Sequence, residues 1–74
     1  MPKLPVVSPK RLLRFLSKFG FQKDYITGSH FILYNPTNGK RVVVPFHAKD
    51  LPKGTLMSIL NQAGISRNDF LGSF

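Results

Sequence analysis

Two histidines, His30 and His47, stand out in this sequence of 74 residues because histidine is the side chain whose charge changes near neutral pH. His30 follows the pair Gly28-Ser29 and opens an apolar run, FILY, that is typical of a strand. The chain has no Cys and no Glu, and its three Asp are far apart in the sequence. This composition excludes cysteine nucleophiles and disfavours both paired-carboxylate hydrolysis and a two-metal site.

Histidine chemistry without carboxylates fits one phosphodiester reaction, the cleavage of RNA by its own 2′-hydroxyl group. The substrate supplies the nucleophile, so the protein has to orient it, exchange protons and place positive charge against the phosphorane. His30 is suited to the proton transfer, and Lys or Arg side chains are suited to the charge. The residues alone leave a second role open, in which His30 is a hydrogen-bonded structural histidine at a strand end.

His47 lies in a predicted loop, HAKDLPKG, and is a candidate second acid or base or a phosphate contact. A solvated loop histidine is the alternative. A zinc site made of His30, His47 and Asp50 is disfavoured because the usual ligand spacing is absent. We expect no metal and no other cofactor, because a chain of this length supports one modest core that a large cofactor pocket would consume.

The charge of the chain is strongly positive: eleven Lys and Arg against three Asp give +8. A field of this sign attracts polyanions and repels itself within the compact state, which favours nucleic acid as a partner over charge that serves only solubility. An acidic protein and an anionic membrane surface are the alternatives. The proline-interrupted N-terminus is unlike a signal peptide, and no apolar run approaches the ~20 residues of a membrane span, so we expect a soluble cytoplasmic protein.

The first helix is predicted to begin at Ser8-Pro9, an N-cap followed by a proline at the first helical position, and to end at Gly20. Its apolar residues recur at helical spacing and form one stripe. The opposite face is a basic ridge, whose members are Lys10, Arg11, Arg14 and Lys18. Since no acidic residue is interleaved, the ridge is a candidate phosphate contact or a docking edge for an acidic partner; a plain solvated face is the alternative.

Three antiparallel strands are predicted over residues 21–27, 30–34 and 41–46, with Asn38-Gly39 as the hairpin signal between the last two. Pro45 predicts an edge strand or a strand end. A second amphipathic helix begins between Pro52 and Thr55.

Lys49 and Lys53 flank the N-terminus of this second helix, where unpaired N–H groups and the helix dipole favour an anion. The helix ends at Gly64, and Ser66-x-x-Asp69 predicts a capped last turn that buries Phe70.

This order predicts a single α+β domain of two layers, α-β-β-β-α, with both helices on one face of a three-stranded antiparallel sheet. The domain would span residues 8–74, and the proline-spaced residues 1–7 would form a flexible lead-in. Double-stranded-RNA-binding domains share this order of elements, which by itself says little about function.

The triplet Gly28-Ser29-His30, the segment RVVVPFH at 41–47 and the segment LPKGTLMSILNQAGIS at 51–66 together resemble the HicA family of bacterial and archaeal type II toxins. The resemblance extends from about residue 8 to residue 70. It implies a double-stranded-RNA-binding-domain-like fold and an mRNA interferase, an RNA endonuclease that causes growth arrest and is neutralised by a HicB-type antitoxin.

The resemblance implies that His30 is the catalytic histidine. We predict that Ser29, beside it, contacts the RNA. Two other classes of function stay open: a non-catalytic RNA-binding module of the same fold, and a basic domain that only docks an acidic protein.

Overall fold

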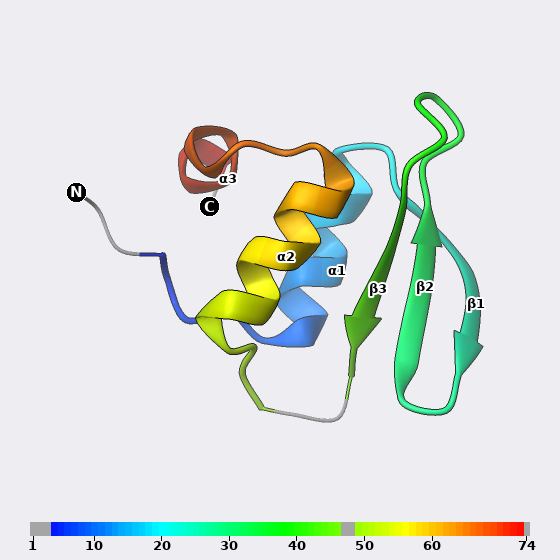
Figure 1. Ribbon diagram of the computed structural model, residues 1–74, viewed down its shortest axis with the longest axis horizontal. Helices are drawn as coiled ribbons and strands as arrows, with labels where there is room; N and C mark the ends of the chain where they lie inside the picture. The colour runs from blue at the N-terminus through cyan, green and yellow to red at the C-terminus, as the bar shows by residue number, and fades with distance from the viewer. Residues whose placement is uncertain (1–3, 47–48, 74) are drawn as a thin grey trace.

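The computed structural model describes residues 4–46 and 49–73, which form six elements around one core. Within these residues, no helix is long and apolar enough to cross a membrane. The elements are α1 (Pro9–Lys18), β1 (Gln22–Thr27), β2 (His30–Tyr34), β3 (Arg41–Pro45), α2 (Lys53–Ala63) and α3 (Arg67–Ser73), as Figure 1 shows. The predicted α+β order is confirmed, and the last turn predicted after Ser66 is a separate helix.

Local capping determines where the helices begin and end. The Ser8 hydroxyl accepts a hydrogen bond from the Arg11 N–H at 3.2 Å, and Pro9 takes the first helical position of α1. At the C-terminal end of α2, Gly64 is left-handed, and the N–H of the next residue, Ile65, donates to the Leu60 carbonyl at 3.0 Å. This bond closes a Schellman motif, as the sequence predicted.

The three strands form an antiparallel sheet in the order β1-β2-β3, so β1 and β3 are its edges. The strand β3 ends at Pro45, in agreement with the prediction from that residue. All six residues of β1 are exposed, and Figure 1 shows β1 as the strand farthest from the helices. The helices therefore lie nearest to β3, and β1, at the opposite edge of the sheet, projects beyond them.

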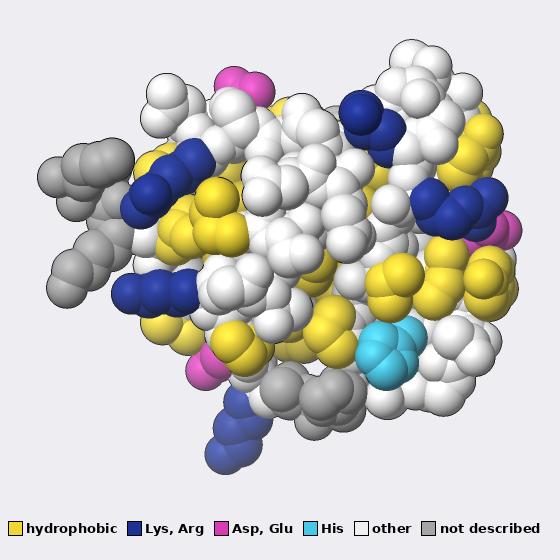
Figure 2. All heavy atoms as spheres, in the orientation of Figure 1, with side chains coloured by type: hydrophobic (Ala, Val, Ile, Leu, Met, Phe, Trp, Pro, Cys, Tyr) yellow, Lys and Arg dark blue, Asp and Glu magenta, His cyan; other side chains and the backbone are white. Residues whose placement is uncertain are grey.

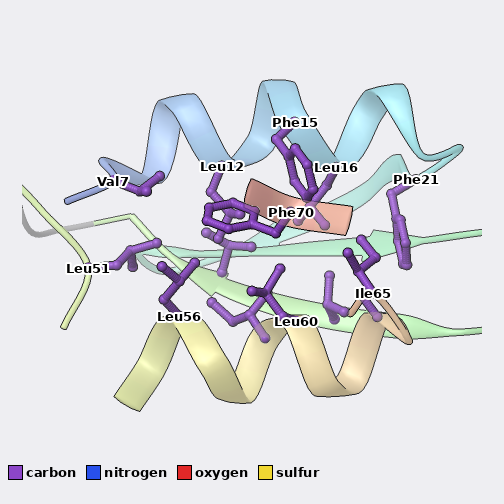
Figure 3. Packing of buried hydrophobic residues seen from close by; sticks show 14 of the residues in the cluster. Val7, Leu12, Phe15, Leu16, Phe21, Leu51, Leu56, Leu60, Ile65 and Phe70 are labelled. Carbon is purple, nitrogen blue, oxygen red and sulfur yellow. The ribbon is translucent and has the colours of Figure 1, made fainter. Parts of the chain in front are cut away.

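The core lies between the helices and one face of the sheet. Leu33, Val42 and Val44 point from β2 and β3 toward the helices and are buried. Figure 3 shows side chains of α1 and α2 converging on Phe70, which fills the space between them. The opposite face of the sheet is left uncovered by these elements.

The segment before α1 is packed from Leu4 onward, which corrects the prediction of a flexible lead-in over residues 1–7. Leu4 and Val7 are buried in the core, and the Val7 carbonyl accepts a hydrogen bond from the Leu51 N–H at 2.8 Å. Residues 4–8 belong to no helix or strand, and an irregular segment is still able to bury apolar side chains. Residues 1–3 lie outside the described residues.

A buried asparagine joins α1 to the β2–β3 hairpin. Asn35 donates from its side-chain amide to the Phe19 carbonyl at 3.0 Å, and its side-chain oxygen accepts from the Thr37 N–H at 2.9 Å. We expect Asn35→Ala to lower the free energy of unfolding by about 1–3 kcal/mol, because it removes two partly buried hydrogen bonds to backbone groups. Urea denaturation measures the loss. Asn38→Ala, which removes one exposed hydrogen bond, should cost clearly less; equal losses would contradict the role of Asn35.

Candidate functional site

A two-residue turn places His30 at the start of β2. Gly28 and Ser29 connect β1 to β2, and Thr27 pairs with His30 across the turn. Gly28 has a φ of 57°, whereas Ser29 has a negative φ. A positive φ at the first loop position alone is the pattern of a type II′ turn, whose twist matches that of the strands. The turn therefore determines the position of the His30 backbone, from which the imidazole projects.

Gly28→Ala is expected to lower the free energy of unfolding by about 1–3 kcal/mol, because an alanine is strained at this positive φ. A Cβ at Gly28 would meet no atom within 4 Å, so the cost would come from the backbone alone. Gly54→Ala is the matched control, since space is open there too, and alanine in a helix favours folding. Thermal unfolding of both variants tests this, and similar losses would contradict the turn assignment.

His30 is exposed on the face of the sheet that the helices leave uncovered. Phe31 and Leu33 of β2 point toward the core, and successive strand side chains alternate between faces. His30 therefore lies on the open face together with Ile32. Figure 2 shows the histidine side chain in cyan at the surface, beside hydrophobic side chains. The sequence alone did not determine which face of the sheet His30 occupies, because residues 31–34 are apolar on both sides of the pleat.

Contacts beyond the end of β3 hold the turn in place. The Phe46 N–H donates to the Ser29 carbonyl at 2.6 Å, which continues the pairing of β3 with β2 one step past Pro45. The Phe46 ring stacks on Phe31 with 4.6 Å between centroids, and the Lys23 ammonium lies 5.1 Å from the Phe31 ring centre. His30 is therefore attached to a braced segment rather than to a loose loop.

The basic ridge of α1 lies on a different surface from His30. All four of its members are exposed, on the face of α1 turned away from the core; they are Lys10, Arg11, Arg14 and Lys18. Since α1 packs against the covered face of the sheet and His30 occupies the open face, the ridge and the imidazole belong to separate layers. Figure 1 shows that α1 begins at the same end of the molecule as β2.

The N-terminus of α2 is a second cationic place at that end of the molecule (Figure 1). Lys49 and Lys53 are exposed there, and Lys53 is the first helical residue. The N-cap is Pro52, whose side chain has no acceptor to offer to the first N–H groups. These N–H groups and the positive end of the helix dipole suit a phosphate.

The open face also carries residues that the sequence analysis did not single out. Tyr25 pairs with Ile32, and Tyr34 pairs with Arg41. The Arg41 guanidinium lies 4.8 Å from the centre of the Tyr34 ring and forms an ion pair with Asp24. These residues lie on the same face as His30 because of the strand register. The sequence does not state this register directly, so it did not identify them.

The second candidate acid or base, His47, lies outside the described residues. Among residues 4–46 and 49–73, no group of three His, Cys, Asp or Glu side chains is close enough to hold a metal ion.

Comparison with known families finds a match that covers more than half of the chain. The model described as the HicA toxin of bacterial toxin-antitoxin systems matches residues 9–65, from the first residue of α1 to the end of the Schellman motif after α2. No curated protein matches the chain.

Proposed function

Because the chain belongs to the family of HicA toxins of bacterial toxin-antitoxin systems, we propose that it is an RNA endonuclease that cleaves mRNA in the cytoplasm, with His30 as its catalytic acid or base. The observation that carries the proposal is the position of His30. Its imidazole is exposed on the uncovered face of the sheet, at the end of a tight turn and a braced strand. Such an imidazole is accessible to a polymer, and strand pairing holds the backbone from which it projects.

In the proposed reaction, the 2′-oxygen of the RNA attacks the adjacent phosphorus and the bond from phosphorus to the 5′-oxygen breaks. The 2′-hydroxyl loses a proton and the departing 5′-oxygen gains one, so the products end in a 2′,3′-cyclic phosphate and a 5′-hydroxyl. His30 carries out one of these transfers, a contribution of typically 10²–10⁴-fold. Water or a second side chain, for which His47 is the candidate, carries out the other.

Positive charge would hold the RNA along the protein. Lys49, Lys53 and the N-terminus of α2 are proposed to bind phosphates near the cleaved bond, and Ser29 to contact the RNA beside His30. The ridge of α1 would bind more distant phosphates from its own surface. A HicB-type antitoxin would neutralise the toxin by covering His30, and its acidic groups would match the +8 charge of the chain.

The reaction predicts a specific dependence on the substrate and none on added metal. The purified protein should cleave an RNA oligonucleotide in excess EDTA at an unchanged rate, because no step needs a divalent ion. A single 2′-deoxy nucleotide on the 5′ side of the cleaved bond should block cleavage there, since the nucleophile is missing. Electrophoresis of end-labelled RNA measures both. Binding without products from the wild-type chain would instead identify a non-catalytic RNA-binding module.

Removing the Lys53 charge is expected to weaken RNA binding uniformly across sequences. Lys53→Ala should reduce the slope of log K against log salt concentration by about 1, the effect of one lost phosphate contact. Lys40→Ala removes the same charge from the β2–β3 loop, at the opposite end of the molecule in Figure 1. Fluorescence anisotropy at several salt concentrations compares the two, and equal slopes would contradict a specific phosphate site at α2.

A further inference from the structure

The open face of the sheet carries an aromatic and aliphatic surface in line with His30. Tyr25 is 54% exposed and Val43 is 43% exposed. Between them, Ile32 is buried although it lies outside the core under the helices. Its cross-strand partners are Tyr25 on one side and Val43 on the other. These three residues form a small second apolar layer that no element in the described chain covers.

Strand register places Tyr25 close to the histidine. Thr27 is directly opposite His30, and Tyr25 lies two residues before Thr27 on the same strand and the same face. Tyr25 is therefore the diagonal neighbour of His30, a relation that corresponds to about 7–8 Å between backbones and is within reach of an aromatic side chain. Tyr34 lies on the same face, about 13 Å along β2 from His30.

The net charge of the chain, +8, favours a polyanion as the partner of this face. Asp24 is the carboxylate near the face, and Arg41 already pairs with it while lying over the Tyr34 ring. A second copy of this chain is disfavoured, because each copy carries +8. An added protein strand is also disfavoured, since the free edge of β1 contains Lys23 and a register shift between Lys23 and Tyr25.

We propose that Tyr25 is a stacking platform for an unpaired base of single-stranded RNA, next to the phosphate that His30 acts on. The inference rests on the proposed function, because it requires RNA at this site. Tyrosine rings stack with the bases of single strands, whereas bases within an A-form duplex are already stacked on one another and are not available to a flat protein surface. The open face thus selects unpaired RNA, and Tyr25 is a positioning residue rather than a proton donor.

The composition of the chain provides a direct readout. It has no Trp and two Tyr, so intrinsic fluorescence excited in the tyrosine band comes from Tyr25 and Tyr34, both on the open face. A His30→Ala/Tyr34→Phe variant leaves Tyr25 as the source of the signal and removes the group proposed to cleave. Titration with an oligouridylate of about ten nucleotides, within the usual site sizes, should quench this fluorescence. An adenine–uracil RNA duplex of equal length should not.

Affinities of variants separate stacking from charge. In the His30→Ala background, Tyr25→Ala should weaken binding of the oligouridylate by about tenfold and leave duplex binding unchanged, while Tyr25→Phe should retain single-strand affinity. Ile26→Ala is the matched control. Ile26 is 51% exposed on the same strand but pairs with Phe31 on the other face, so its loss should leave RNA binding unchanged.

Several results would overturn the platform without touching the proposed function. They are unchanged single-strand affinity in Tyr25→Ala, equal losses for single strand and duplex, or a Tyr25→Ala effect confined to binding of a co-expressed antitoxin. The last would assign the face to a protein instead of RNA. Because none of these readouts requires cleavage, failure of the nuclease proposal is judged separately, from the wild-type chain and its products.

Discussion

Replacing His30 by alanine is expected to abolish RNA cleavage while leaving the fold and most of the RNA affinity intact. The imidazole is exposed at the first residue of β2, so its removal creates no cavity, and the change in stability should be within about 0.5 kcal/mol. Loss of a positioned general acid or base should lower the cleavage rate by about 10²–10⁴-fold. Gel analysis of RNA products gives the rate. Induced expression in cells, with growth and transcript integrity followed together, gives the toxic effect.

The matched control for this experiment is Thr27→Ala, the cross-strand partner of His30 on the same face. It removes a small polar side chain beside the imidazole and should change the rate far less. A circular dichroism spectrum and a thermal unfolding curve must show that His30→Ala is folded. If folded His30→Ala cleaves RNA and arrests growth like the wild type, His30 is a structural residue and the binding-module interpretation replaces the enzyme.

Phe70→Ala is expected to cause the largest loss of stability, about 3–5 kcal/mol, because it empties the centre of the core. Phe70 is 0% exposed, and its ring meets that of Phe15 edge-on with 4.8 Å between centroids. Native domains are stable by only about 5–15 kcal/mol, and small ones lie toward the lower end. Most of the stability of this chain therefore depends on one side chain of α3, which follows the matched residues 9–65.

Urea denaturation followed by circular dichroism measures this loss, with Asn68→Ala as the control. Asn68 is exposed on the same helix, so its replacement should change the free energy of unfolding by no more than about 0.5 kcal/mol. If both variants unfold at nearly the wild-type urea concentration, α3 is a dispensable appendage, contrary to the packing in Figure 3.

The sequence determined the features whose causes lie within a few residues of one another. Ser8-Pro9 predicted the start of α1, Asn38-Gly39 the β2–β3 hairpin, and Gly64-Ile65 the end of α2; all three are confirmed. Each depends on a local hydrogen bond or on a backbone conformation that a particular residue allows. The burial of Phe70 was predicted on the same grounds, from the Ser66 cap that begins α3.

Residue types also limited the chemistry to few classes. A chain with two histidines, no cysteine, no glutamate and a charge of +8 has few reactions available to it. His30 emerged as the candidate on that basis, and its catalytic role is a prediction that the experiments above test.

Tertiary structure decided which face of the sheet is open and what lies beside His30. Residues 31–34 are apolar on both sides of the pleat, so alternation along β2 did not predict which face is buried. The helices determine this by packing on one face and leaving the other exposed. The packing of Val7 likewise involves Leu51, far away in the sequence. Tyr25 comes to the side of His30 because β1 pairs with β2 in one register, with a bulge at Asp24 that breaks the simple alternation. Burial and register are properties of the assembled layers, and a linear pattern does not contain them.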